Sequence, residues 1–468
     1  MKNLRKNLLF VTLILGLIIS GCTAVTPETP SATEIGLTLE ETTPIPAATL
    51  APVLEVRFTI VADEDLKTPV SALYSAFFPG ETPSFVESGG DLRITRPLEG
   101  FEDRPVIPTT FLPQAEMVPL TDSQDIRDFI DFAISVDGQE TLIAAGELPS
   151  SVLLTDQSGK TIEIDQPVRR VISAYGPATA LVYTVGAEER LVSASYLGAR
   201  DPLGAAVMEK IDPRFPAILG EEFFTQDDFN IEQAASLDPD LILTSARSAW
   251  LEAAGQLDIP VFLFEAETTT LLKEAILSTG QLFGPYTTTR AKGWVAYYDQ
   301  IVNTVREQTS DLPEENRVRV LFTGTDPLRV ASGDMYQTEI IEAAGGISVT
   351  SELTGYWNNV NLEQVVIWDP DVIIVPPYGG ATVEAITEST EWQALTAVQA
   401  GRVYRMPKLV VPWDTPAPDS VLGIVWMGQR LYPDRVDLQC SDEAEYFYNT
   451  FYNYPIAAEE IESICRFE

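Results

Sequence analysis

One short motif occurs twice in this chain, and the copies start 131 residues apart, at Asn230 and Asn361. Each copy reads Asn-Ile/Leu-Glu-Gln and, eight residues after its asparagine, Asp-Pro-Asp followed by an apolar run. Asparagine is a favoured helix N-cap, and a glutamate in the first turn suits the helix dipole. Proline then ends the helix and the apolar run reads as a strand. The motif predicts a helix that leads into a strand in each copy, and its duplication predicts two related lobes.

The stretch that contains both copies alternates short β-rich runs with helical patterns. Residues 171–173, 241–243 and 261–264 are apolar runs of this kind, and such alternation predicts parallel sheets covered by helices. Residues 286–308 carry an apolar stripe at helical spacing. This stripe fits an ordinary packing helix of one lobe, but its place between the copies favours a connecting helix. The predicted fold class is α/β, with two parallel-sheet lobes bridged by a single long helix.

The N-terminus has the pattern of a secretory signal. Lys2, Arg5 and Lys6 precede an apolar run at residues 8–19 that is too short to span a bilayer comfortably. The following Ser-Gly-Cys places Cys22 in a stretch that resembles a bacterial lipobox, which implies a lipid on this cysteine. A cleaved peptide with an incidental cysteine and an uncleaved anchor are the alternatives. Residues 22–53 are rich in Thr, Pro, Ala and Glu, and predict a flexible tether. We expect an extracytoplasmic protein anchored to the bacterial membrane.

Charge and composition exclude several functions. The chain has 30 basic and 69 acidic residues, for a net charge of −39, which argues against binding to nucleic acid or to anionic lipid headgroups. It contains no histidine, so a His-based triad, a His general base and His-ligated zinc are all excluded. No Gly-x-Ser-x-Gly motif is present either. We therefore expect no enzyme, although catalysis by carboxylates alone stays an alternative.

Two cysteines remain if Cys22 carries lipid. Cys440 and Cys465 flank apolar-periodic stretches that read as two short helices. In an oxidising compartment two such thiols commonly pair. We expect one disulfide between them, with two free buried thiols as the alternative.

Residues 152–468 resemble the solute-binding proteins of importers for iron-siderophores, haem and cobalamin, which have two α/β lobes joined by one long helix. The resemblance depends on the order of several segments: residues 156–164 and 168–173, both repeated units, the long helix, and residues 401–404 and 420–426. It implies a permease dimer of an ABC importer as partner. The implied organisation is a signal peptide (1–21), a tether (22–53), an accessory domain (54–150), a first lobe (151–284), a connecting helix (285–312) and a second lobe (313–468).

Residues 54–150 predict a small α/β accessory domain. Residues 56–62 read as a strand and residues 72–77 as part of a helix. Residues 126–148, with an Asp-Phe and a Gly-Gln stretch, resemble the C-terminal helices of molybdate-type binding proteins. The segment is too short for a complete two-lobe protein of that type, so we expect no full binding cleft in it.

The glutamates of the two motifs, Glu232 and Glu363, are candidate docking residues. In the resembled class, one acidic residue on each lobe pairs with arginines of the permease, and these glutamates occupy matching places in the two copies. The alternative is that each only stabilises its helix dipole. Both roles are compatible.

Ligand-binding candidates follow the strands, because parallel strands present their carboxyl ends and loops to a cleft. Aromatic faces suit a large chelate, and arginine suits oxyanion groups. For each residue, packing in the core is the alternative. The candidates are Tyr175, Tyr196, Arg247 and Trp250 in the first lobe, and Tyr336, Tyr356, Trp357, Tyr378, Trp413 and Asp414 in the second.

The expected ligand is a metal chelate of the siderophore, haem or corrinoid type, held without a resident cofactor or a protein metal site. An oxyanion such as molybdate or tungstate is the alternative within the same fold. A lipid-anchored ligand sensor that reuses the fold is an alternative from another class.

Overall fold

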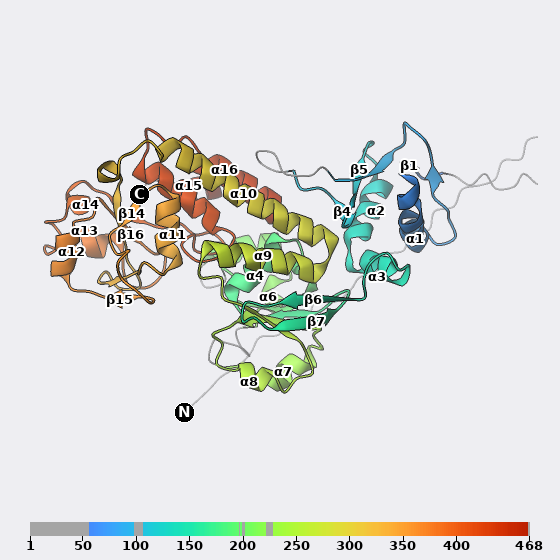
Figure 1. The fold of residues 1–468 in the computed structure, drawn as a ribbon, viewed down its shortest axis with the longest axis horizontal. Coiled ribbons are helices and arrows are strands. Elements are labelled where there is room, and N and C mark those ends of the chain that lie inside the picture. Colours follow the sequence, from blue (N-terminus) through green and yellow to red (C-terminus); the bar gives the residue numbers. More distant parts are fainter. Residues whose placement is uncertain (1–55, 98–105, 196, 199–201, 221–227, 467–468) are drawn as a thin grey trace, which may run out of the picture. The chain divides into compact units, whose positions relative to one another are not determined.

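The computed structural model describes residues 56–97, 106–195, 197–198, 202–220 and 228–466 (Figure 1). The signal peptide, the tether, Cys22 and the candidate Tyr196 lie outside these residues. Within them, no helix is both long enough and apolar enough to cross a membrane.

The first lobe is built on a four-stranded parallel sheet with the order β11-β10-β8-β9. Every residue of the central strand β10 is buried, as a parallel sheet covered on both faces requires. An antiparallel hairpin of β6 and β7 precedes the sheet. The strands are β6 (Ser151–Thr155), β7 (Thr161–Asp165), β8 (Val171–Ser173), β9 (Leu191–Ala194), β10 (Leu241–Ser245) and β11 (Val261–Phe264). The helices are α4 (Gly176–Thr184), η2 (Glu188–Arg190), α5 (Pro202–Ile211), α6 (Phe215–Ile218), α7 (Ile231–Ser236), α8 (Leu251–Ala254) and α9 (Thr269–Phe283).

The second lobe repeats this plan with the parallel order β14-β12-β16-β17. Its strands are β12 (Arg319–Phe322), β13 (Arg329–Val330), β14 (Ile347–Ser348), β15 (Asn358–Asn359), β16 (Val372–Val375) and β17 (Val403–Arg405). Its helices are η3 (Glu314–Asn316), α11 (Tyr336–Ala343), α12 (Leu362–Trp368), α13 (Val383–Thr387) and α14 (Thr396–Gln399). The strand of the first motif, β10, and that of the second, β16, belong to two separate sheets. The predicted two-lobe α/β fold is confirmed.

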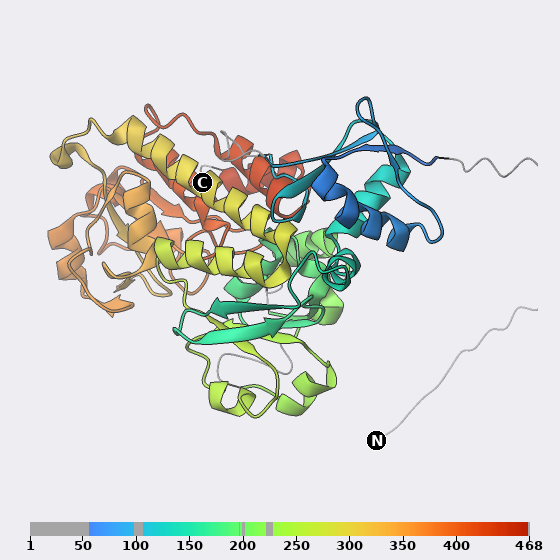
Figure 2. The same ribbon diagram turned by 45° about the vertical axis from the view of Figure 1, so that its right-hand side comes forward.

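The long helix α10 (Pro285–Thr309) joins the lobes. Helix α9 lies against it, and α15 (Ser420–Leu431) packs on it as well (Figure 2). Two further helices close the chain, α16 (Cys440–Phe451) and α17 (Ala458–Cys465). The predicted disulfide is present between Cys440 in α16 and Cys465 in α17.

The C-terminal helices contact α10, and in the first lobe the ammonium group of Lys210 on α5 donates to Glu460 on α17 at 2.6 Å. The hydroxyl of Tyr297 on α10 donates to Glu443 on α16 at 2.9 Å. The guanidinium of Arg290 donates to the main-chain oxygens of Thr450 and Phe451 at 2.9 and 3.0 Å. One continuous set of buried side chains therefore includes α10, α15, α16 and residues of both sheets. Such packing resists wide separation of the lobes.

The accessory domain has a five-stranded mixed sheet with the order β2-β1-β3-β5-β4 and a hydrophobic core of its own. Its strands are β1 (Thr59–Val61), β2 (Ser84–Phe85), β3 (Leu92–Thr95), β4 (Thr110–Leu112) and β5 (Ala115–Pro119), and its helices are η1 (Glu64–Leu66), α1 (Lys67–Phe77), α2 (Gln124–Ile134) and α3 (Val136–Ala144). The segment expected to be helical, residues 126–148, contains most of α2 and all of α3. They separate at Ser135, whose hydroxyl caps the second helix by accepting from the Gly138 N–H.

Specific hydrogen bonds connect this domain to the rest of the described chain. The buried side chain of Gln139 donates to the main-chain oxygen of Phe283 at 2.7 Å. The hydroxyl of Thr110 lies 2.8 Å from that of Thr289 on α10. The domain thus contacts the turn between α9 and α10.

Candidate functional site

A cavity of about 500 Å³ lies between loops of the two lobes. The first lobe contributes the start of α4, directly after β8, and the segment after β9. The second lobe contributes the loops that follow β12, β16 and β17. The carboxyl ends of both parallel sheets therefore meet at this cavity, the place where such folds bind ligands. Its lining residues are Gly176, Pro177, Gly198, Thr325, Tyr378, Gly379, Lys408, Val410, Val411, Pro412 and Thr415.

Tyr378 is the sequence-predicted candidate that lines this cavity. Its hydroxyl donates to the Oδ2 atom of the fully buried Asp414 at 2.6 Å. The side-chain amide of Gln337 donates to the main-chain oxygen of Asp414 at 3.0 Å. Burial raises the pKa of Asp414 to about 6, and the Tyr378 hydrogen bond acts in the opposite direction. Asp414 thus lies behind the wall and fixes the phenol that forms part of it.

The turn after Tyr378 requires glycine. Gly379 has a φ of +83°, and a Cβ atom there would lie 2.7 Å from the Cα and Cβ atoms of Thr325. A side chain is excluded on both counts. The loops after β12 and β16 therefore approach each other closely at the cavity wall.

A second cluster contains three further candidates and joins the lobes. The guanidinium of Arg247, in the loop after β10, pairs with the carboxylate of Glu267 and lies 5.6 Å from the ring centroid of Tyr356 in the second lobe. Burial lowers the pKa of Arg247, but Glu267, Tyr175 and Tyr356 raise it by more, so the net shift is upward. The structure thus places Arg247 over the ring of Tyr356 and close enough to Tyr175 for that phenol to influence its pKa.

Three candidates are corrected, because they are core residues. Trp250 is 5% exposed and stacks on Phe229, with ring centroids 4.2 Å apart. Tyr336 is fully buried, and its hydroxyl lies 2.6 Å from the Ser420 hydroxyl. Trp413 is fully buried as well. None of the three side chains lines the cavity.

Trp357 takes an intermediate position. It is half-buried, and the guanidinium of Arg329 lies 5.8 Å from its ring centroid. A Cβ atom at Gly324 would lie 2.8 Å from the Trp357 ring. Its ring therefore packs on the start of the loop after β12 and supports the cavity wall from outside.

Sequence reasoning missed Lys408, Thr325 and Thr415, which line the cavity. Lys408 lies three residues beyond the end of β17, and Thr325 lies three residues beyond the end of β12. Their position just after a strand is the signal that could have found them. The candidates named from the sequence at such positions are aromatic residues, arginine and one aspartate, and lysine and threonine are not among them.

The motif glutamates lie on matching exposed helices. In both copies the asparagine caps the helix as expected: Asn230 accepts from the Gln233 N–H at 3.0 Å, and Asn361 accepts from the Gln364 N–H at 2.9 Å. Glu232 and Glu363 both stand exposed in the first turn. The arrangement is compatible with docking and with stabilisation of the helix dipole.

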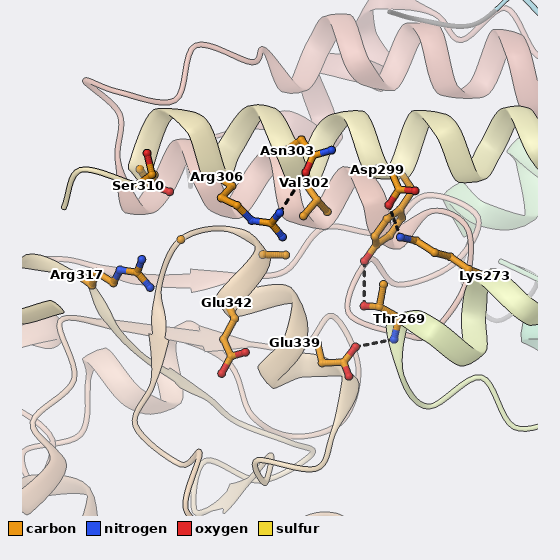
Figure 3. Close-up of a pocket in the computed structure, with 14 residues that line it drawn as sticks. Thr269, Lys273, Asp299, Val302, Asn303, Arg306, Ser310, Arg317, Glu339 and Glu342 are labelled. Carbon is orange, nitrogen blue, oxygen red and sulfur yellow. Dashed lines mark hydrogen bonds and ion pairs between the residues drawn. The ribbon is translucent and has the colours of Figure 1, made fainter. Parts of the chain in front are cut away.

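A larger cavity, of about 650 Å³, lies beside the connecting helix (Figure 3). Its walls come from α9, α10 and α11, and from Arg317 before β12. Here the lobes touch: Glu339 on α11 accepts a hydrogen bond from the main-chain N–H of Thr269 on α9. The hydroxyls of Tyr298 and Tyr336 lie 3.3 Å apart, just beneath. The contacts of this region therefore connect the two lobes directly, beside the connecting helix.

Within the described ranges, no group of three or more His, Cys, Asp or Glu side chains is placed to hold a metal ion.

The sequence profile of the periplasmic binding protein family matches residues 171–409, just over half of the chain. The chain belongs to the periplasmic binding protein family. Among curated relatives of this periplasmic binding protein, the molybdate-binding protein MolA of Haemophilus influenzae is 30% identical over 158 residues, which cover 32% of this chain and 45% of MolA. The vitamin B12-binding protein of Yersinia pestis is 26% identical over 255 residues, which cover 53% of this chain and 78% of that protein. The alignment thus spans less than half the length of MolA.

Solved structures agree with the fold of this periplasmic binding protein. A periplasmic solute binding protein from Veillonella parvula is 25% identical, with a TM-score of 0.59 over 67% of this chain and 96% of its own. MolA bound to molybdate is 21% identical, with a TM-score of 0.58 over 65% of this chain and 99% of its own. The family match does not include the accessory domain, so the resemblance of residues 126–148 to molybdate-type proteins stays a prediction.

Proposed function

We propose that this solute-binding protein is the extracytoplasmic substrate-binding component of an ABC importer, and that it captures a metal chelate of the siderophore, haem or corrinoid type. The observation that carries the proposal is the cavity between the carboxyl ends of two parallel sheets, walled by both lobes. A ligand that touches both walls binds best to one relative placement of the lobes and so favours that placement. A partner that contacts both lobes can therefore distinguish the ligand-bound protein from the free protein.

The chemistry of the two clusters supports an anionic ligand with oxygen groups. Lys408 and Tyr378 line the cavity, and Arg247 with Tyr175 and Tyr356 forms the second cluster. The charge of Arg247 is paired with Glu267, so the argument depends on Lys408: a cation in the cavity lining favours an anion over a cation. Val410, Val411 and Pro412 add an apolar wall, which suits the organic frame of a chelate.

An oxyanion is the second candidate, favoured by one observation. Helix α4 begins at Gly176, which lines the cavity, and a helix N-terminus attracts negative charge. MolA, which shares the fold, was solved with molybdate. On this alternative the hydroxyls of Thr325 and Thr415 would bind the oxyanion together with Lys408.

The proposal includes the membrane and the permease. A lipid on Cys22, which lies outside the described residues, would anchor the protein. Glu232 and Glu363 would contact basic residues of a permease dimer, one from each lobe. Exposure of both carboxylates at matching places of the repeat supports this role. Capture and delivery, rather than catalysis, are then the whole of the activity. A lipid-anchored sensor would need the ligand cavity but not the docking carboxylates.

A thermal-shift screen of the purified protein tests the ligand. The probes are a ferric catecholate siderophore, a ferric hydroxamate siderophore, haemin, cyanocobalamin, sodium molybdate and sodium tungstate. A ligand that binds only the folded state stabilises it by about 2.7 kcal/mol at 100 times its Kd, so one chelate is expected to raise Tm with its concentration. A shift with molybdate or tungstate alone selects the oxyanion candidate. No shift with any probe contradicts both.

Two substitutions test the permease contact. The double variant Glu232→Lys/Glu363→Lys reverses both docking charges and is expected to abolish uptake of the selected ligand while its Kd stays unchanged. The matched control is Glu314→Lys/Glu315→Lys, on the 3-10 helix η3, which also reverses two exposed carboxylates. If both double variants take up the ligand at the wild-type rate, the two glutamates are not docking residues, and the sensor alternative is supported instead.

A further inference from the structure

The two motif helices differ on one exposed face. From the asparagine cap to the Asp-Pro-Asp turn, α7 and α12 match in cap, in the buried position (Ala234 and Val365) and in the left-handed backbone of the first aspartate, Asp238 and Asp369. The backbone and burial pattern of one copy are thus an internal reference for the other.

The difference lies three and four residues after the docking glutamate. The first copy has Ala235 and Ser236 there, and the second has Val366 and Ile367. All four side chains are exposed, and Val366 and Ile367 are 44% and 75% exposed. Residues three and four apart on a helix lie on one face. Val366, Ile367 and the carboxylate of Glu363 therefore form one surface patch, which we call the lobe-2 patch.

The fold does not need the apolar members of this patch. The first copy forms the same helix, cap and turn with alanine and serine at the two positions. Ile367 keeps most of its side chain in solvent, so it adds little to the core. Two adjacent branched apolar side chains on an exposed face instead favour contact with a partner.

The chemistry of the patch selects the kind of partner. A carboxylate beside two apolar side chains fits a protein surface with a basic group at the edge of an apolar depression. The permease is the partner proposed for Glu363, and a permease that binds Glu363 would also contact this face of α12. An anionic bilayer is disfavoured by the charge of −39 on the chain.

We propose that the lobe-2 patch is the stronger of the two permease contacts, so that the two lobes dock unequally on the permease dimer. This inference depends on the proposed function, because it assigns unequal strength to the two sites that Glu232 and Glu363 mark. The second lobe holds the permease through charge and apolar burial, and the first lobe through charge alone.

The test measures the affinity of the purified full chain for the permease–ATPase complex of its importer in nanodiscs. The variant Val366→Ala/Ile367→Ser, which copies the first lobe, is expected to weaken binding by about tenfold or more, since it removes two apolar side chains from a buried contact. The reciprocal variant Ala235→Val/Ser236→Ile is expected to strengthen it. Leu153→Ser removes an equally exposed leucine, 70% exposed on β6, and is expected to change nothing. Ligand Kd should stay constant in all three.

The outcomes separate the two proposals. Wild-type affinity of Val366→Ala/Ile367→Ser, together with loss of binding by Glu232→Lys/Glu363→Lys, overturns unequal docking and leaves the permease contact standing. Wild-type affinity of both double variants overturns the permease contact itself. Self-association in sedimentation that Ile367→Ser abolishes, or binding to phosphatidylcholine vesicles that the same change abolishes, assigns the patch to a second copy or to a bilayer and also overturns the inference.

Discussion

Glu339 of the second lobe caps a helix of the first: its carboxylate accepts the main-chain N–H of Thr269, the first residue of α9. The preceding residue, Thr268, caps the same helix by accepting from the Leu271 N–H at 3.2 Å. One lobe therefore supplies a negative group to the positive end of a helix in the other (Figure 3). The contact stabilises the lobe arrangement that the structure shows.

Loss of this contact should destabilise the protein. Glu339→Ala removes both the acceptor and its favourable charge at the helix N-terminus, and each such cap contributes about 1 kcal/mol. Glu342→Ala is the matched control, because Glu342 lies three residues on in α11, beside the same cavity, and is not a partner of Thr269. Denaturant unfolding of the two variants checks the difference. Equal loss of unfolding free energy in both would mean that the cap contributes nothing specific.

The pair Tyr378 and Asp414 should behave as one unit. Tyr378→Phe deprives a buried carboxylate of its donor and is expected to cost about 1–3 kcal/mol of unfolding free energy. In an Asp414→Ala background the same change should cost far less, because no buried carboxylate remains. A double-mutant cycle measures this coupling, and couplings of contacting residues reach about 0.5–3 kcal/mol.

A distant pair is the control for that cycle. The control cycle combines Tyr183→Phe with Asp414→Ala. The Tyr183 hydroxyl donates to Asp212 at 3.0 Å in the first lobe and not to Asp414. The losses of unfolding free energy from these two changes should therefore add. Coupling of equal size in both cycles would contradict a specific Tyr378–Asp414 unit. Ligand affinity gives a second measurement, because Tyr378→Phe changes the cavity wall and Tyr183→Phe does not.

Local patterns were predictable from the sequence. Asn230 and Asn361 each cap a helix through a hydrogen bond to a residue three positions later. Because both partners lie within the motif, the motif alone predicts where each helix begins. The duplicated Asp-Pro-Asp likewise marks the start of β10 and β16. Parallel sheets and a bridging helix follow from the order of such units.

The cavity could be predicted only in part, because loop side chains are oriented by distant residues. Trp250 stacks on Phe229, and Tyr336 bonds to Ser420, 84 positions away. Neither Phe229 nor Ser420 can be recognised as a contact partner from the sequence next to Trp250 or Tyr336. Asp414 is comparable: the sequence suggested it as a ligand group, and the structure buries it behind Tyr378.

The disulfide should stabilise the C-terminal helices without affecting the ligand cavity. The bond between Cys440 and Cys465 closes a loop with a sequence separation of 25. Loop closure of this length removes about 3.5 kcal/mol of chain entropy from the unfolded state. Cys440→Ser/Cys465→Ser is therefore expected to lower the unfolding free energy by about this amount. Neither residue lines the cavity, so Kd for the selected ligand should not change; a changed Kd would show that these helices influence the cavity.

Asp419 should make stability depend on pH. Its fully buried carboxylate accepts from the hydroxyls of Tyr448 and Tyr452 at 3.0 and 2.8 Å. Burial raises its pKa to about 7, and the hydrogen bonds act in the opposite direction. An unfolded aspartate titrates near pH ~3.9, so the folded state binds the extra proton between about pH 4 and pH 7. The stabilising contribution of this group is complete below the unfolded pKa and is lost as the pH rises through the folded one.

Asp419→Asn removes the titration and keeps an oxygen acceptor at the same place. The unfolding free energy of the wild type minus that of the variant is expected to fall steadily from pH 4 to pH 7, at a rate approaching 1.4 kcal/mol per pH unit at most. Urea unfolding at four pH values in this range measures the difference. Taking the difference cancels the other carboxylates, which titrate in both proteins. Parallel curves would mean that Asp419 is already ionised at pH 4, and that the two phenols stabilise its charge more strongly than burial opposes it.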